Sequence, residues 1–554
     1  MIRGVPSTMN DDWQLNMWKV IKYAASVHGT REVTSYRHLQ NGEVHKLTYA
    51  RIYQRCCAVA NTLKDFGIEP GDRVAFLAWN DHRCYELYFS VSGIGAVLLP
   101  LNFRLSQREL VYILNHSRPK GIFVDDTLLP QAEALSKDYK FEFYVIMSDK
   151  NIKDIETNLD PSYGYEELVN SHPKAYNWEE IDERSTATAC YTSGTTGQPK
   201  GVYYSHRALM LHRFIGTSII QRFDVGDVYL QVTPMYHING HGIYLGATMA
   251  GCKIVLPGRY TPDSLIDIII KEKVNVACGI ATLWKLISES LERVEPKPAL
   301  KIRAETGGIE PPIALIKKLK EYGIELTHCW GATETDALAT ACFLKPELKG
   351  LPEEKQLEYA AKQGYPVFPG EIKLVDPGTD SELPWDGKSV GEVWIRGPYV
   401  IKEYYNDPRT SEQCTHDGWW RSGDLATIDE LGYMKIVDRL KDVIKSGGEW
   451  ISSVDLENFL MTYQYISEAA VIGVPHPKWD ERPLALIVLK PEYRNMPAEK
   501  IETELTNYLL KKFTKWQLPE KFLFVEEIPK TSTGKVAKRE LREQYKNIYE
   551  VEVA

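Results

Sequence analysis

Residues 70–78 read Pro-Gly-Asp-Arg-Val-Ala-Phe-Leu-Ala, a turn followed by an apolar run. An apolar run without polar alternation is typical of a strand that is buried on both faces. Upstream, Thr48 can cap a helix that Gly67 ends. Downstream, residues 96–99 and 121–124 form two more apolar runs with a helical pattern between them. Strands that alternate with helices of this length predict βαβ units and a largely parallel sheet.

The alternation continues past residue 202, and the pattern changes near residue 364. Short strand-like runs separated by Gly and Pro turns follow, which indicates a β-rich subdomain at about 364–437. The remaining residues, 438–554, read as a compact α+β unit. We therefore expect an α/β protein whose N-terminal domain, 1–437, holds two parallel-type α/β lobes and the β-rich subdomain.

Composition excludes several classes of protein. The chain has 554 residues, of which 44% are hydrophobic, enough for a large globular core. The net charge of −9 argues against nucleic acid as a partner, because such proteins usually carry a basic surface. The nine cysteines include no C-x-x-C pair, which favours reduced thiols in a cytoplasmic protein. No signal peptide and no membrane span are expected.

The strongest chemical signal is the stretch at 191–201, which reads Tyr-Thr-Ser-Gly-Thr-Thr-Gly-Gln-Pro-Lys-Gly. Two glycines let the backbone fold tightly, while hydroxyl groups, backbone N–H groups and a lysine can face one polyphosphate. The spacing differs from that of a Walker A loop, since no Gly-Lys-Ser/Thr follows. The candidate nucleotide-binding residues here are Thr192, Ser193, Gly194, Thr195, Thr196, Gly197 and Lys200.

This stretch resembles the phosphate-loop signature of the adenylate-forming superfamily, which includes acyl-CoA synthetases, peptide-synthetase adenylation domains and luciferase-like enzymes. Further matching motifs follow in order, and the resemblance covers roughly residues 45–545. Residues 447–455, Gly-Gly-Glu-Trp-Ile-Ser-Ser-Val-Asp, are most similar to the medium-chain acyl-CoA synthetase branch. The resemblance implies ATP, Mg²⁺ and coenzyme A as cofactors.

Residues 330–335, Trp-Gly-Ala-Thr-Glu-Thr, resemble the family's adenine and metal motif. An aromatic face at Trp330 can stack on adenine, with Gly331 and Ala332 beside it. Thr333 would hold the α-phosphate, and Glu334 offers the hard oxygen that Mg²⁺ prefers. The segment at 306–311 resembles the strand end that lines the acyl and adenine pockets. Its candidate residues are Gly308, Ile309 and Glu310, with isoleucine where the family often has alanine.

The C-terminal motifs resemble the parts of the family that bind ribose and move. Asp424 would accept hydrogen bonds from both ribose hydroxyls. Arg439 would contact ribose or phosphate, and Lys441 would be the pivot of a mobile domain, 438–554. Asp438 stands where family members more often have glycine, a change that a turn should tolerate. The loop that would face the CoA channel contains Ser446, Gly447, Gly448 and Glu449.

Lys535, in the run Pro-Lys-Thr-Ser-Thr-Gly-Lys at 529–535, resembles the family's catalytic lysine. Attack of a carboxylate on the α-phosphate develops negative charge that an ammonium group can neutralise. His237, in Met-Tyr-His-Ile-Asn-Gly-His at 235–241, matches the family's acyl-pocket motif. Zinc at His237 and His241 is not favoured, because the H-E-x-x-H pattern is missing.

The resemblance implies an AMP-forming acyl-CoA synthetase that makes an acyl-adenylate and then a thioester. Gly331 stands where acetate-specific relatives have Trp, which favours a short- to medium-chain fatty acid. A short hydroxy acid such as 4-hydroxybutyrate is an alternative, because His237, Asn239 and His241 offer polar partners. A stand-alone enzyme that loads a carrier protein is another alternative. Assembly into a homo-oligomer is left open.

Overall fold

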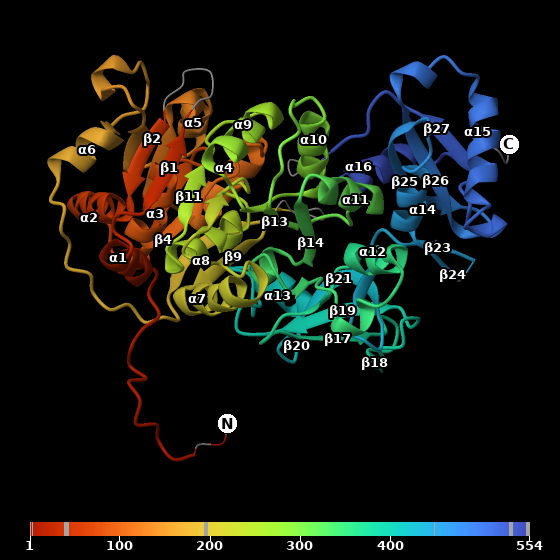
Figure 1. Cartoon of the computed structure of the whole chain (residues 1–554), viewed down its shortest axis with the longest axis horizontal. Coiled ribbons are helices and arrows are strands. Elements are labelled where there is room, and N and C mark those ends of the chain that lie inside the picture. The colour runs from red at the N-terminus through yellow and green to blue at the C-terminus, as the bar shows by residue number, and fades with distance from the viewer. Residues whose placement is uncertain are drawn as a thin grey trace. The chain divides into compact units, whose positions relative to one another are not determined.

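The computed structural model describes residues 2, 4–37, 44–192, 198–447, 449–530 and 536–549 (Figure 1). Contacts group the chain into two compact units. The first contains residues 1–371 and 396–420, and the second contains residues 372–395 and 421–554. The large first unit is built on mainly parallel sheets and the C-terminal part on a mainly antiparallel one, so the predicted α/β fold class is confirmed.

The first unit contains a seven-stranded sheet in the order β7-β6-β5-β3-β4-β8-β9. All its pairs are parallel except the β8–β9 pair. Its strands are β3 (Arg73–Leu77), β4 (Val97–Pro100), β5 (Gly121–Asp125), β6 (Phe143–Met147), β7 (Ser162–Gly164), β8 (Thr186–Tyr191) and β9 (Gly201–Ser205). The associated helices are α1 (Met17–Val27), α2 (Tyr49–Asp65), α3 (His82–Gly93), α4 (Gln107–Ser117), α5 (Leu129–Asp138) and α6 (Tyr165–Ser171).

The start of α2 and the strand β3 form as the sequence predicts. Thr48 caps α2 by accepting a hydrogen bond from the backbone N–H of Arg51. The four residues after Arg73 in β3 are fully or nearly fully buried. The apolar run that follows the turn at residues 70–72 is therefore a central strand with side chains packed on both faces.

A nine-stranded sheet, β16-β15-β14-β13-β12-β10-β11-β1-β2, forms the other half of this unit. Its strands are β1 (Glu32–Tyr36), β2 (Val44–Thr48), β10 (Val228–Leu230), β11 (Lys253–Leu256), β12 (Val276–Cys278), β13 (Ile302–Thr306), β14 (Ile324–Trp330), β15 (Thr340–Ala341) and β16 (Tyr365–Pro366). The helices are α7 (His206–Ile215), α8 (Ile243–Met249), α9 (Pro262–Glu272), α10 (Ala281–Leu291), α11 (Ile313–Glu321) and α12 (Glu353–Ala361). A π-helical turn, Gly216–Ile220, extends α7.

The strands between residues 371 and 439, which overlap the β-rich subdomain expected at about 364–437, form a six-stranded sheet in which β22 pairs with β21. Its elements are β17 (Glu371–Val375), β18 (Glu382–Leu383), β19 (Gly391–Arg396), α13 (Pro408–Cys414), β20 (Thr415–His416), β21 (Trp419–Ile428) and β22 (Met434–Arg439).

The C-terminal residues form a five-stranded sheet with helices on its faces. Its elements are β23 (Ile444–Ser446), β24 (Glu449–Ile451), α14 (Ser453–Leu460), β25 (Ile466–His476), β26 (Asp480–Leu489), α15 (Ala498–Leu509), β27 (Lys521–Phe524) and α16 (Lys538–Tyr545). Alternate residues of β25 and β26 enter two separate apolar clusters, one on each face of the sheet. This is the predicted α+β unit.

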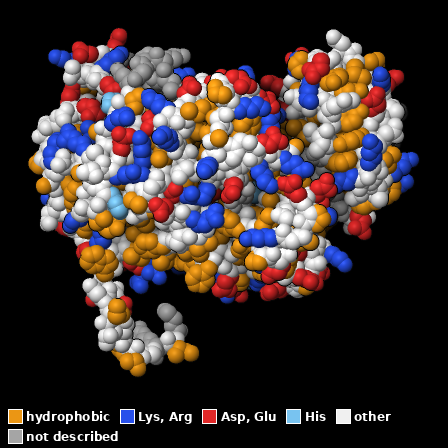
Figure 2. All heavy atoms as spheres, viewed as in Figure 1, with side chains coloured by type: hydrophobic (Ala, Val, Ile, Leu, Met, Phe, Trp, Pro, Cys, Tyr) orange, Lys and Arg blue, Asp and Glu red, His pale blue; other side chains and the backbone are white. Residues whose placement is uncertain are grey.

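Burial and charge are distributed as in an ordinary globular protein. All nine cysteines lie in the described part of the chain, form no disulfide, and are buried except for Cys414, which is half-buried. On the face shown in Figure 2, lysine and arginine side chains are interspersed with aspartate and glutamate. None of the described helices is long and apolar enough to cross a membrane.

Candidate active site

The phosphate loop predicted from the sequence connects two antiparallel strands, β8 and β9. Tyr191 pairs with Gly201, and the next residue, Thr192, donates its backbone N–H to the carbonyl of Lys200 at 2.9 Å. The loop therefore closes at its base, with Thr192 and Lys200 side by side. Its remaining predicted contacts, Ser193, Gly194, Thr195, Thr196 and Gly197, lie outside the described residues.

A short segment, residues 401–405, joins this loop to the predicted metal motif, and we call it the strap. The backbone N–H of Ile401 donates to the carbonyl of Glu334 at 2.8 Å. The backbone N–H of Tyr405 donates to the carbonyl of Gly201 at 2.9 Å. One stretch of backbone thus contacts both the end of the phosphate loop and the residue predicted to bind Mg²⁺.

The side chain of Tyr404, in the strap, orients Glu334, the predicted metal ligand. The hydroxyl of Tyr404 donates to Oε1 of Glu334 at 2.7 Å, and the Lys200 ammonium lies 4.9 Å from the centre of the Tyr404 ring. On the other side, the hydroxyl of Tyr204, in β9, donates to the carbonyl of Thr333 at 2.7 Å. Thr333, Glu334 and Lys200 are therefore held together, as the sequence predicts.

The donor set around Glu334 fits magnesium carried by a nucleotide. Among the described residues no group of three or more His, Cys, Asp or Glu side chains is placed to enclose an ion. Mg²⁺ is commonly held by one or two carboxylates together with substrate phosphates. Glu334 is only partly buried and lies beside the base of the phosphate loop, so its carboxylate suits that role.

Sequence reasoning missed a buried charge cluster directly behind this motif. Asp336 is fully buried in a left-handed backbone conformation, and its Oδ2 lies 2.9 Å from Nδ1 of His212 and 2.7 Å from the Arg213 guanidinium. Arg213 also donates to the carbonyl of His241. Burial alone would raise the pKa of Asp336, but Arg213 and His212 more than offset it and lower the pKa.

This cluster ties the metal motif to the acyl-pocket motif, because one arginine contacts Asp336 and His241 together. The His212 ring also stacks on Tyr399 with ring centres 4.2 Å apart. A histidine and an arginine in the last turn of a helix carry no local pattern that indicates this role.

The ends of β13 and β14 bring the predicted adenine-site segments together. The two strands are parallel neighbours, so the segment 306–310 and Trp330 emerge at the same edge. Gly308 has φ +89°, a conformation that favours glycine, and Ile309 is about half exposed. At Gly331, a Cβ would lie 2.1 Å from the carbonyl oxygen of Ala337. Close backbone packing therefore explains this glycine, beside any effect on acyl-chain length.

The acyl-pocket motif is held by buried polar side chains. Gln231 donates to the carbonyls of Thr233 and Gly240, at 2.7 and 3.2 Å. His237 lies just before the 3₁₀ turn Ile238–Gly242. His241, in that turn, is partly exposed, and Nδ1 of its ring lies 3.4 Å from Sγ of Cys278. The protein atoms around the ring lower its pKa to about 3 by desolvation. The His241 ring is thus neutral and directed toward a thiol.

In the second unit, the predicted ribose residues lie on paired strands. Asp424 on β21 pairs with Arg439 on β22, and the Arg439 guanidinium lies 3.2 Å from the Asp424 carboxylate. Glu392, which the sequence did not single out, accepts from the backbone N–H of Gly423 at 3.1 Å and pairs with Arg421 at 3.2 Å. Glu392 therefore fixes the turn that carries Asp424.

Asp438, expected in a turn, instead lies within strand β22 and is buried. Its Oδ2 accepts hydrogen bonds from the backbone N–H and the hydroxyl of Ser453, at 2.6 and 2.7 Å. Lys538 donates to the same hydroxyl at 2.7 Å. The carboxylate thus connects β22 to the start of α14, a connection that a glycine could not make. Lys441, the predicted pivot, follows and is exposed.

The loop predicted to face CoA is a tight connection between β23 and β24, where Ser446 pairs with Glu449. The Ser446 hydroxyl is buried and accepts from Arg482 at 3.0 Å, while Glu449 is exposed. Gly447 has φ +60° and donates its N–H to the carbonyl of Trp479 at 2.8 Å. Gly448 and Lys535 lie outside the described residues.

Comparison with known proteins identifies the class that this fold and site define. A family model described as "AMP-binding enzyme" matches residues 22–405, and one described as "AMP-binding enzyme C-terminal domain" matches residues 455–535. The chain belongs to the AMP-binding enzyme family.

Two relatives that match this chain over nearly its whole length are CoA ligases. The chain is 42% identical over 557 residues to a long-chain-fatty-acid–CoA ligase of Thermus thermophilus, covering 99% of this chain and 98% of that one. It is 38% identical over 542 residues to a medium-chain-fatty-acid–CoA ligase of Ectopseudomonas oleovorans, covering 97% of each. The predictions of an acid–thiol ligase and of ATP, Mg²⁺ and coenzyme A as its cofactors are confirmed.

Solved structures share the fold. The anthranilate CoA ligase AuaEII in complex with anthranoyl-AMP superposes with a TM-score of 0.83 at 23% identity, over 98% of this chain and 99% of that one. ATP-bound MatB from Rhodopseudomonas palustris gives a TM-score of 0.79 at 24% identity, over 97% of this chain and 100% of that one.

Proposed function

We propose that this protein activates a short- to medium-chain carboxylic acid in two steps. The acid's carboxylate attacks the α-phosphorus of ATP, and pyrophosphate leaves. The CoA thiolate then attacks the acyl carbon of the adenylate, and AMP leaves as the thioester forms. The observation that carries this proposal is the strap, which holds Glu334 against the base of the phosphate loop through Tyr404 and Tyr405.

Each predicted site residue has a role in this scheme. Thr192, Lys200 and the loop between them bind the β- and γ-phosphates, and Trp330 stacks on adenine. Thr333 contacts the α-phosphate, and the Glu334 carboxylate is the protein ligand for Mg²⁺. Mg²⁺ supplies neutralising charge to the phosphates. The other proposed contacts are Gly308, Ile309, Glu310, Gly331 and Ala332 at the adenine and acyl sites, Asp424 and Arg439 at ribose, and His237 beside the carboxylate.

Lys535 neutralises the charge that develops at the α-phosphate in the first step. We propose that residues 438–554 then rotate about Lys441, which withdraws Lys535 and presents the CoA loop, residues 446–449. Domain closure of this kind is a common way to use one site for two reactions.

Among fatty acids, a medium chain is supported by the relative from Ectopseudomonas oleovorans. The second candidate is a hydroxy acid, which the polar groups around His241 favour. Loading of a carrier protein is the third. We further propose a cytoplasmic location and no nucleic-acid partner, in keeping with the net charge of −9. We also propose that copies of this chain can assemble into a homo-oligomer.

Lys535→Ala tests the two-step scheme. We expect it to abolish acyl-AMP formation, measured as acid-dependent pyrophosphate release, while thioester formation from supplied acyl-AMP and CoA stays largely intact. Lys530→Ala is the matched control, since Lys530 lies five residues upstream and pairs with Glu468 at 2.8 Å. Equal loss of both half-reactions in the Lys535 variant would refute the role of Lys535.

A further inference from the structure

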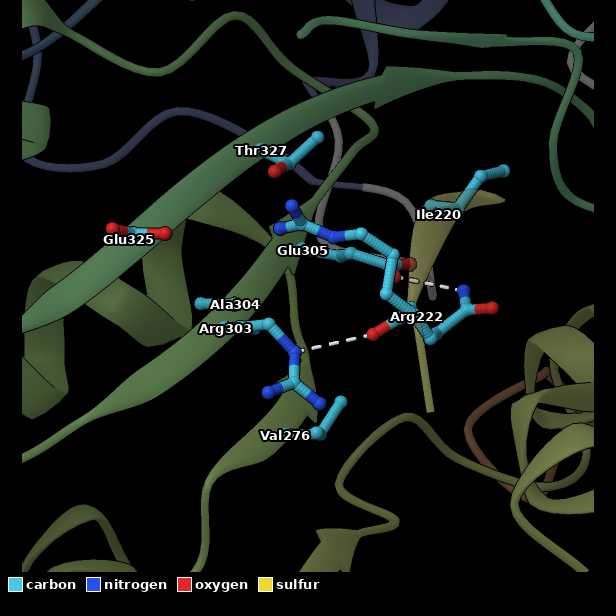
Figure 3. Close-up of a pocket in the computed structure, with 9 residues that line it drawn as sticks. Ile220, Arg222, Val276, Arg303, Ala304, Glu305, Glu325 and Thr327 are labelled. Carbon is cyan, nitrogen blue, oxygen red and sulfur yellow. Dashed lines mark hydrogen bonds between the residues drawn. The ribbon is translucent and has the colours of Figure 1, made fainter. Parts of the chain in front are cut away.

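Glu305 and Asp438 are buried carboxylates that the two-step scheme does not use. Glu305 lies beside the recess drawn in Figure 3 and accepts a hydrogen bond from Nε2 of Gln221 at 2.7 Å. That contact fastens the end of the π-helical turn to β13, so it joins two elements packed inside the large unit. Asp438 is different, because its partners lie on the far side of the proposed pivot, Lys441.

The hydrogen bonds of Asp438 cross the position of Lys441 in the chain. Oδ2 of Asp438 accepts from the backbone N–H of Ser453 at 2.6 Å and from its hydroxyl at 2.7 Å. The hydroxyl of the preceding residue, Ser452, donates to the carbonyl of Val437 at 2.5 Å. Both acceptors precede the pivot and both serines follow it. A rotation about Lys441 that moves the following residues must therefore break these bonds.

A lysine that follows the predicted catalytic loop completes this contact. Lys538 is the first residue of α16, donates to the Ser453 hydroxyl at 2.7 Å and pairs with Glu457 at 2.7 Å. Burial raises the pKa of Asp438, and the nearby Lys538 charge opposes that rise. We call Asp438, Ser453 and Lys538 the latch.

The latch lies next to the base of the loop that contains Lys535. An antiparallel bridge between Lys530 and Val536 closes this base. The latch lysine comes two residues after the bridge, so it holds the base of the loop beside β22. The residue that follows the latch aspartate in β22 is Arg439, the proposed ribose contact. The latch thus ties the catalytic loop to the strand proposed to bind ribose, as the first half-reaction requires.

A second ion pair on α16 does not cross the pivot. Arg542, about one helical turn after Lys538, pairs with Asp442 at 2.7 Å. Asp442 follows Lys441, so both members of this pair move together during the proposed rotation. The two cations lie on one face of α16, but the contacts of Lys538 reach across the pivot and the pair of Arg542 with Asp442 does not.

We infer that the latch holds the protein in the arrangement that forms acyl-AMP, and that the latch opens before CoA reacts. This inference rests on the proposed function, because it names positioning residues that control the proposed rotation. An interaction that is made in one of two arrangements raises the population of that arrangement. Loss of the latch should therefore slow the first half-reaction and spare the second.

Asp438→Ala tests the latch, because it removes both hydrogen bonds to Ser453 while Lys538 keeps its pair with Glu457. The two rates are single-turnover pyrophosphate release without CoA, and thioester formation from supplied acyl-AMP and CoA. We expect the ratio of the first rate to the second to fall about fivefold or more. A purely structural loss would slow both reactions alike and leave this ratio unchanged. Arg542→Met is the matched control and should keep the ratio within about twofold, because its ion pair does not cross the pivot.

If Asp438→Ala does not fold, Ser453→Ala decides. It removes the hydroxyl that links Asp438 to Lys538 but keeps the backbone N–H, and it should lower the ratio about threefold. An unchanged or higher ratio in a folded latch variant overturns the inference, as does an equal fall in Arg542→Met. Failure of the proposed function is a separate result, namely no pyrophosphate release by the unmodified enzyme with any acid.

Discussion

Removal of the Tyr404 hydroxyl tests how the strap orients Glu334. In Tyr404→Phe the ring stays, so its contact with the Lys200 ammonium, 4.9 Å away, is preserved. What is lost is one hydrogen bond of 2.7 Å to the Glu334 carboxylate. A hydrogen bond to a charged group contributes about 1.5–3 kcal/mol. Since Glu334 is partly exposed, we take the lower value, which corresponds to about tenfold in rate.

The assay is pyrophosphate release in the first half-reaction, measured over a range of Mg²⁺ concentrations at saturating ATP. We expect kcat for adenylation to fall about tenfold and the Mg²⁺ concentration for half-maximal rate to rise. Thioester formation from supplied acyl-AMP should change less, because pyrophosphate has already left before that step begins. Tyr405→Phe is the control: its ring stacks on Tyr203, and the change should stay within about twofold.

Two results would refute this reasoning. Full activity in Tyr404→Phe with an unchanged Mg²⁺ dependence would mean that the hydroxyl does not orient Glu334. An equal loss in Tyr405→Phe would mean that the strap responds as a packed unit, without a specific role for this hydrogen bond.

Three further predictions follow from buried or paired charges. Asp336→Asn leaves the Arg213 cation without its charged partner, so the free energy of unfolding in urea should fall by about 3–5 kcal/mol; an unchanged midpoint would contradict this. Burial lowers the pKa of His206 to about 4 from 6.5, so below pH 6.5 the unfolded chain binds a proton that the folded chain does not. Stability should therefore fall by about 1.4 kcal/mol per pH unit from pH 6.5 to 4, and His206→Gln should reduce the slope of urea stability against pH by that amount; an equal slope would count against it. Asp424→Ala should abolish the preference for ATP over 2′-deoxyATP in pyrophosphate release, and a preserved preference would remove Asp424 from the ribose site.

Much of the fold follows from local patterns. The strand at residues 73–77 and the cap at Thr48 both form as the sequence indicates. Sheet membership is different, because hydrogen bonds between strands depend on residues far apart in sequence. Strand β1 pairs with β11, so Val33 lies beside Ile254, and no nearby residue encodes that partner.

Some residues of the candidate site could be predicted from local motifs, and others could not. Thr192 and Lys200 belong to a short motif whose residues indicate an anion-binding loop, whereas Glu334 is singled out only by the resemblance of its motif to the family's. Tyr404 could not be predicted, because it reaches Glu334 across 70 residues and its own surroundings show no motif. Asp336 also had no signal, since nothing beside it in the sequence indicates that it is buried against Arg213.

Because the cysteines are buried, their reaction with a thiol reagent can report local opening of the folded protein. Eight thiols are inside the two units and one, Cys414, is half-buried, with none in a disulfide. Burial raises the pKa of several of them, including Cys56 and Cys329, which removes the reactive thiolate as well as access. A thiol reagent added to the native enzyme should therefore label in proportion to the time each region spends open. Mass spectrometry of the labelled peptides would rank local stabilities along the chain without any introduced probe.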